Sequence, residues 1–156
     1  MRDQEEMGNI FNEDFRDFLT ALNNKDVEYI LVGGFSVILN GYSRTTGDMD
    51  IWVKRSPVNY QKISQAFIEF RMPVFDMTEG NFLNHPNWDV FTFGLPPSAI
   101  DIMVSLKGLN FDECFKKASY FDDEGLTIRT LHISDLIEAK KASGRPKDLN
   151  DLENLM

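Results

Sequence analysis

The sequence predicts a single α+β domain in which short β-strands and amphipathic helices share one core. Three observations carry this prediction. A short apolar run from Tyr29 to Val32 has the length and composition of a buried strand. Residues 48–53 and 98–106 alternate apolar and polar side chains, as strands with two different faces do. Residues 11–24 place apolar side chains at helical spacing, which predicts a helix packed on the sheet.

The other elements follow from their start and stop signals. Ser56 and Pro57 mark a helix that ends before Pro73, and 73–88 reads as a loop containing His85 and Trp88. We expect His85 to be a surface residue and Trp88 to cover the core. After this loop we expect a strand at 89–93, a helix at 111–117 capped by Asn110, and a hairpin at 121–131. Two helices then close the chain. The first is capped by Ser134 and ends at Gly144, and residues 145–152 start the second.

Composition restricts the class of protein. The 156 residues are 42% hydrophobic, which suits one globular domain spanning 1–156. No apolar run approaches the roughly 18 residues of a membrane span, and Cys114 is the only cysteine, which excludes thiolate zinc sites. The simplest localisation is cytoplasmic. A net charge of −9 opposes non-specific nucleic-acid binding, so an RNA or protein partner would have to meet a local basic rim: Lys107, Lys140, Lys141, Arg145 and Lys147.

The stretch from Glu28 to Lys54 organises the chain. Its strand ends at Gly33-Gly34, and a short helix from Phe35 to Leu39 follows. Alternation then places Asp48 and Asp50 on one strand face, roughly 7 Å apart. Two half-buried carboxylates repel, and a divalent cation between them removes that cost. Oxygen ligands suit Mg²⁺ or Mn²⁺, and a glycine turn offers N–H groups to phosphate, so the pattern indicates phosphoryl or nucleotidyl transfer.

The order of Gly33-Gly34, Gly41, Arg44, Thr46 and Asp48-x-Asp50 resembles the core motif of the DNA polymerase β-like nucleotidyltransferase superfamily. It is most similar to the small prokaryotic branch that includes abortive-infection and toxin-type nucleotidyltransferases. The resemblance implies a mixed sheet flanked by helices, with two helices at the C-terminal end. It also implies two magnesium ions and transfer of a nucleoside monophosphate from a nucleoside triphosphate, such as ATP, to a hydroxyl acceptor.

The resemblance assigns roles to individual residues. Asp101, the one acid within an apolar strand, takes the place of the third metal-binding carboxylate beside Asp48 and Asp50. The alternative is an aspartate at a solvent-facing strand edge. The residues expected to contact the triphosphate are Gly33, Gly34, Ser36, Arg44 and Lys140. In many relatives serine directly follows the glycines, whereas here Phe35 precedes Ser36.

The C-terminal stretch contains a helical lysine, Lys140, followed by Arg145-x-Lys147-Asp148-x-x-Asp151. This is similar to the later motifs of the toxin-type enzymes. In that comparison Asp148 orients Lys140 or Arg145, or acts as a base. The alternative is an ordinary basic helix end with an ion pair.

Three other functions remain open at this point. The chain could be a catalytically inactive relative that binds a nucleotide or a partner protein. It could be a magnesium-dependent nuclease or phosphohydrolase that uses the same carboxylates with water as the nucleophile. In biological role it could be a toxin–antitoxin component with an antitoxin partner.

Overall fold

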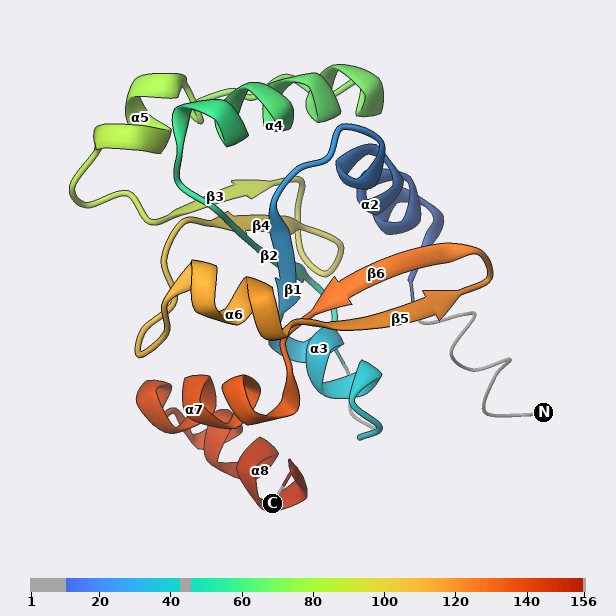
Figure 1. Ribbon diagram of the computed structural model, residues 1–156, viewed down its shortest axis with the longest axis vertical. Coiled ribbons are helices and arrows are strands. Elements are labelled where there is room, and N and C mark those ends of the chain that lie inside the picture. The colour runs from blue at the N-terminus through green and yellow to red at the C-terminus, as the bar shows by residue number, and fades with distance from the viewer. Residues whose placement is uncertain (1–10, 43–45, 156) are drawn as a thin grey trace.

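The structure is a computed structural model, and it describes residues 11–42 and 46–155. In this part of the chain one six-stranded mixed sheet is surrounded by seven helices (Figure 1). The helices are α2 (Glu13–Asn24), α3 (Gly33–Leu39), α4 (Pro57–Phe70), α5 (Glu79–Asn84), α6 (Phe111–Lys117), α7 (Ile133–Ser143) and α8 (Pro146–Leu155). The strands are β1 (Tyr29–Val32), β2 (Met49–Val53), β3 (Val90–Phe93), β4 (Ile100–Met103), β5 (Ser119–Asp123) and β6 (Leu126–Thr130). The predicted α+β class, with two C-terminal helices, is confirmed.

The strand order is β3-β4-β2-β1-β6-β5, so β2 lies inside the sheet. It pairs antiparallel with β1 and parallel with β4. Two antiparallel hairpins, β3–β4 and β5–β6, complete the two sides of the sheet. The acidic strand predicted around Asp50 therefore has a neighbour on each side, and each neighbour carries another part of the predicted motif.

Each face of the sheet buries its own apolar cluster. One cluster lies under α2 and α4 and contains Phe18, Ile51 and Phe67. The other lies under α6, α7 and α8 and contains Trp52 and Cys114. The predicted alternation along β2 is thus confirmed. Cys114 is buried, and burial raises the pKa of its thiol to about 12, so this residue behaves as a small apolar core residue.

Most of the predicted helix ends are confirmed, and one is wrong. Ser56 accepts a hydrogen bond from the N–H of Asn59, and Asn110 accepts one from Glu113. The helix expected to be capped by Ser134 begins two residues earlier than that cap would place it, at Ile133. His132 caps it, because Nδ1 of its ring accepts the N–H of Ser134 at 3.1 Å.

The segment 73–88 contains a helix that the sequence did not predict. Helix α5 has six residues, and the hydroxyl of Thr78 accepts the N–H of Asn81 at its start. Trp88 stacks on Phe91 with 4.9 Å between ring centroids, which confirms that it covers the core. His85, expected at the surface, is partly covered because its ring packs edge-on against Trp88. The strand predicted at 98–106 is shorter, Ile100–Met103.

Phe18 is the centre of the contact between α2 and α4, and replacing it tests this packing. Its ring is fully buried and meets Phe67 and Phe70 edge-on, at centroid distances of 5.5 and 5.2 Å. We expect Phe18→Ala to lower the free energy of unfolding by about 3–5 kcal/mol, because the cavity is walled by rigid rings. Ile68→Ala, at a 70% exposed position of α4, should change it by less than about 0.5 kcal/mol. Urea denaturation of both variants gives the comparison, and similar losses would contradict the packing described.

Candidate active site

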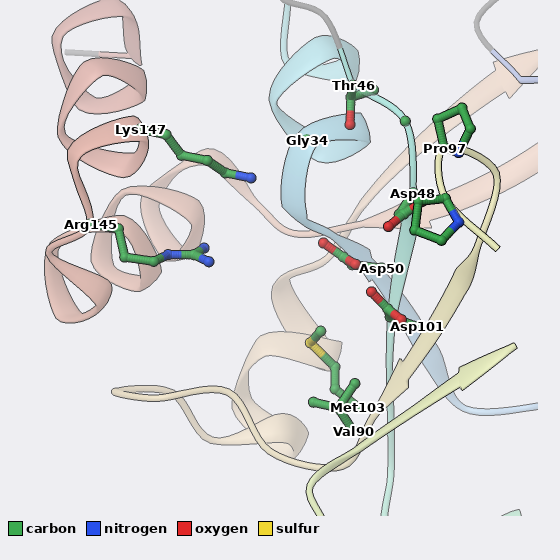
Figure 2. A pocket seen from close by; sticks show the side chains of 12 residues that line it. Gly34, Thr46, Asp48, Asp50, Val90, Pro97, Asp101, Met103, Arg145 and Lys147 are labelled. Atoms are coloured by element: carbon green, nitrogen blue, oxygen red, sulfur yellow. The ribbon is translucent and has the colours of Figure 1, made fainter.

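Two carboxylates meet on neighbouring strands at one face of the sheet. The parallel register of β2 and β4 places Asp50 directly opposite Asp101. Both side chains are partly exposed, and they project next to one another toward the side where Arg145 and Lys147 stand (Figure 2). Because β4 lies between β3 and β2, Asp101 is not at the edge of the sheet. The structure therefore brings together two of the three predicted metal-binding carboxylates.

Gly33 makes room for this pair. The antiparallel register places Val32 opposite Asp50, so the next residue lies beside the carboxylate. Gly33 has a φ of +69°, and a Cβ built on it would lie 2.3 Å from Oδ2 of Asp50. Both the backbone conformation and the close approach require glycine here. The structure thus requires glycine at position 33, independently of the phosphate contact that the sequence analysis predicted.

The pKa of Asp50 is raised by its position in the site. Burial of Asp50, and then the negative charge of Asp101, raise its pKa to about 6, while Lys147 opposes the rise. Paired carboxylate oxygens of this kind are donors that suit Mg²⁺ or Mn²⁺, so the donor chemistry fits a divalent cation. Within residues 11–42 and 46–155, no three acidic, histidine or cysteine side chains are grouped closely enough to hold a metal ion together.

Asp48, the third predicted ligand, lies just before β2 and lines the same cleft as the pair. Its Oδ1 accepts the backbone N–H of Ala99 at 3.1 Å. Asp101 also has a protein partner, since its Oδ1 accepts the hydroxyl of Thr92 at 2.6 Å. Two of the three carboxylates are therefore oriented by hydrogen bonds from the β3–β4 hairpin and the residues around it.

The carboxylates line an open cleft of about 680 Å³. Gly34 and Thr46 border it beside the sheet, and Pro97 and Met103 border it on the β3–β4 side. Across the cleft stand Arg145 and Lys147, from the start of α8 (Figure 2). An anionic patch thus faces a cationic one over a space large enough for a nucleotide, since small-molecule sites are typically about 300–1,000 Å³. A metal-bound triphosphate carries the charge pattern that both walls match.

The sequence analysis included Arg145 and Lys147 in a local basic rim, but it did not predict that they contact the triphosphate. The turn between the last two helices brings them to the cleft. Gly144 ends α7 with a φ of +65°, and Pro146 begins α8. The available signal was this glycine-to-proline turn, which places both cations at the start of a helix.

Lys140, which the resemblance places at the triphosphate, is buried between the last two helices. It is 5% exposed, and its Nζ pairs with Asp148 at 2.9 Å and with Asp151 at 3.3 Å. It lines a separate cavity of about 100 Å³ and not the larger cleft. Asp50 and Arg145 border both spaces, so the two adjoin. In this structure Lys140 holds α8 against α7 through these two ion pairs.

The remaining predicted residues have different positions. Gly34 borders the cleft, in agreement with its proposed place beside phosphate. Ser36 is fully buried in α3, and its hydroxyl shares a 2.6 Å hydrogen bond with that of Thr130. It does not line the cleft. Phe35, which displaces serine from the position after the glycines, packs in the core. Arg44 lies outside the residues that the structure describes.

The fold is that of nucleotidyltransferases. A crystal structure of a Thermotoga maritima protein, described as a candidate nucleotidyltransferase (TM1012), is similar to this chain with a TM-score of 0.58. The match covers 90% of this chain and 88% of that one at 16% sequence identity, so it concerns the fold alone.

The sequence itself defines the family. Residues 12–156 match the family described as "Nucleotidyltransferase of unknown function (DUF6036)", and the chain belongs to that family. The sequence matches none of the curated proteins with which it was compared. Among the described residues, no helix has both the length and the apolarity needed to cross a bilayer.

The contact between the paired carboxylates predicts how one titrates when the other is removed. Asp101→Asn should lower the pKa of Asp50 below about 6, because a negative neighbour no longer opposes its ionisation. Asp48→Asn is the matched control and should cause a smaller decrease, since Asp48 contributes least to the shift. Carboxyl ¹³C NMR titration measures both. A decrease of equal size in the two variants would contradict the arrangement.

The close approach of Gly33 to Asp50 predicts a stability difference between two glycine substitutions. Gly125 in the β5–β6 turn has a φ of +86° and open space around it, so Gly125→Ala should cost only the backbone term, about 1–2 kcal/mol. Gly33→Ala adds an overlap with Asp50 and should cost about 1–3 kcal/mol more. Urea denaturation compares the two. Equal losses would mean that the carboxylate can move aside at no cost.

Proposed function

We propose that the chain is a metal-dependent nucleotidyltransferase that moves a nucleoside monophosphate from a nucleoside triphosphate to a hydroxyl acceptor. One observation carries the proposal. The carboxylates of Asp50 and Asp101 stand in register beside Gly33, and Arg145 and Lys147 face them across the cleft. Membership in a nucleotidyltransferase family supports this reading of the cleft.

The metal would be held by Asp50 and Asp101, with Asp48 as a third candidate ligand beside them. Mg²⁺ or Mn²⁺ at such a site supplies charge neutralisation for the triphosphate and activates an acceptor hydroxyl. The raised pKa of Asp50 supports this assignment, because a bound cation would relieve the repulsion between the two carboxylates.

The chain's own residues then bind and orient the substrate. Arg145 and Lys147 contact phosphate oxygens and stabilise the negative charge that develops on them. Gly34 lies where its backbone can approach a phosphate closely. The acceptor oxygen bonds to the α-phosphorus, the bond to the bridging oxygen breaks, and pyrophosphate leaves while the acceptor proton passes to solvent.

A second candidate, nucleotide binding without turnover, is favoured by a specific observation. Ser36, the residue of the glycine turn expected to meet the triphosphate, is fully buried with its hydroxyl bonded to that of Thr130. A phosphohydrolase would use the same carboxylates with water as the nucleophile, and would release phosphate in place of pyrophosphate.

The acceptor that we propose is a hydroxyl of RNA, a protein or a small molecule. A net charge of −9 restricts contact with a polyanion to the basic side of the cleft. A toxin role predicts growth arrest when the chain is expressed in a bacterium, with relief by a neighbouring gene. Growth that is unaffected by the active protein would exclude that role without bearing on the chemistry.

Replacing Asp50 tests the chemistry. Purified protein is incubated with Mg²⁺, each α-³²P-labelled nucleoside triphosphate and an acceptor mixture of RNA and protein, and label transfer is measured with pyrophosphate release. Asp50→Asn should lower transfer by at least about a hundredfold, because an amide cannot replace the metal-binding charge. Asp76→Asn, at an exposed loop position, is the control and should retain full activity.

Three outcomes separate the readings. Transfer that persists in Asp50→Asn, with an unchanged circular dichroism spectrum, would contradict the assignment of the site. Binding by the wild type without label transfer to any acceptor would favour the second candidate. Release of inorganic phosphate without pyrophosphate would favour the phosphohydrolase.

A further inference from the structure

Asp148 is a fully buried aspartate, and both of its carboxylate oxygens accept hydrogen bonds. Its Oδ1 accepts Nζ of Lys140 at 2.9 Å, and its Oδ2 accepts Nε of Arg145 at 2.7 Å and the hydroxyl of Ser143. Burial by itself would raise the pKa of Asp148, but these three hydrogen bonds outweigh burial and lower the pKa to about 2. A carboxylate that is covered, fully bonded and this acidic cannot reach or accept an acceptor proton at neutral pH.

Arg145 is held by one edge of its guanidinium group. Nε is bound by Asp148 and also lies 3.0 Å from the hydroxyl of Ser143. Within residues 11–42 and 46–155, its two terminal nitrogens make no hydrogen bond or ion pair, and the side chain is 65% exposed. It borders the cleft that contains Asp50 and Asp101. The edge left unbound is the one that can bind an anion in a bidentate manner.

The network beneath Arg145 joins opposite charges from both C-terminal helices. Lys140 pairs with two buried carboxylates, Asp148 and Asp151, and Arg145 supplies the second positive charge. Lys140 belongs to α7 and both aspartates belong to α8, so the network also fixes the angle between the helices. The backbone of Arg145 is further restricted because Pro146 follows it.

We propose that Asp148 is a positioning residue, which holds Arg145 by Nε so that the terminal nitrogens of its guanidinium bind the triphosphate opposite Asp50 and Asp101. The inference rests on the proposed function for the identity of the ligand. It gives the buried network a role in substrate binding, with Lys140 securing Asp148 and Arg145 making the contact. Asp148 itself touches neither the substrate nor the metal.

A double-mutant cycle tests the inference, with inorganic triphosphate and Mg²⁺ as the probe and calorimetry as the measurement. Arg145→Ala should weaken binding by about tenfold or more, the typical worth of a charge-assisted hydrogen bond. Asp148→Asn should weaken it by nearly the same factor, since an amide oxygen holds Nε poorly. The double variant should bind no more weakly than Arg145→Ala alone, because Asp148 acts only through Arg145.

Two further variants separate positioning from stability. Asp123 is another buried aspartate bonded to an arginine, since it accepts Nη1 of Arg16 at 2.6 Å, and it does not border the cleft. Asp123→Asn should lower the unfolding temperature and leave triphosphate affinity unchanged. Arg145→Lys keeps the positive charge, but a single ammonium group cannot bind Asp148 and phosphate at the same time as the planar guanidinium does. This variant should therefore weaken triphosphate binding almost as much as Arg145→Ala.

The contrary outcomes are defined for each variant. Multiplicative losses in the cycle, unchanged affinity in Asp148→Asn, or nearly full affinity in Arg145→Lys would overturn the positioning role. Nearly full affinity in Arg145→Lys would overturn the role even if Asp148→Asn does not fold. Wild-type protein that fails to bind triphosphate would also overturn it. Wild-type protein that binds triphosphate but transfers no nucleotide would contradict the proposed function, and the cycle would still decide the role of Asp148.

Discussion

The electrostatic conflict between Asp50 and Asp101 is the constraint on which the rest of the site depends. Parallel pairing of β2 with β4 fixes the two carboxylates opposite one another, and Gly33 lets the backbone approach one of them closely. The two strands that carry the carboxylates are anchored by apolar clusters on both faces of the sheet. The repulsion is therefore built into the fold, and a bound cation would relieve it. Such stored repulsion is typical of functional sites.

The positive side of the cleft is built differently from the negative side. The carboxylates project from strands in the middle of the sheet, whereas Arg145 and Lys147 stand at a helix turn near the C-terminal end of the described chain. A turn fixes the position of its side chains poorly unless other contacts hold it. The buried network of Lys140, Asp148 and Asp151 supplies that hold, and it joins α7 to α8. Buried ion pairs contribute little net stability, so a role in geometry accounts for them better than a role in stability.

The sequence predicted the fold and the acidic half of the site because both depend on local patterns. A buried strand reads as an apolar run, and the two faces of β2 read as alternation around Asp50. Asp101 could be placed because the family resemblance implies a third carboxylate on a neighbouring strand, and Asp101 is the one acid within an apolar strand. Helix α5 was missed because its six residues include two asparagines and one glycine, which favour turns. The cap at His132 was missed because serine is the commoner capping residue and stands two positions later.

Residue type alone could not predict which polar and basic side chains border the cleft, because burial decides which of them can reach it. Ser36 and Lys140 have the right chemistry for phosphate, yet both are buried against partners far away in the sequence or on another helix. For Lys140, however, the sequence contained a usable signal. Asp148 and Asp151 lie three residues apart on one helical face, and two acids turned toward a neighbouring helix need a cation from it. Lys140 satisfies that need, whereas Arg145 and Lys147 at the adjoining turn border the cleft.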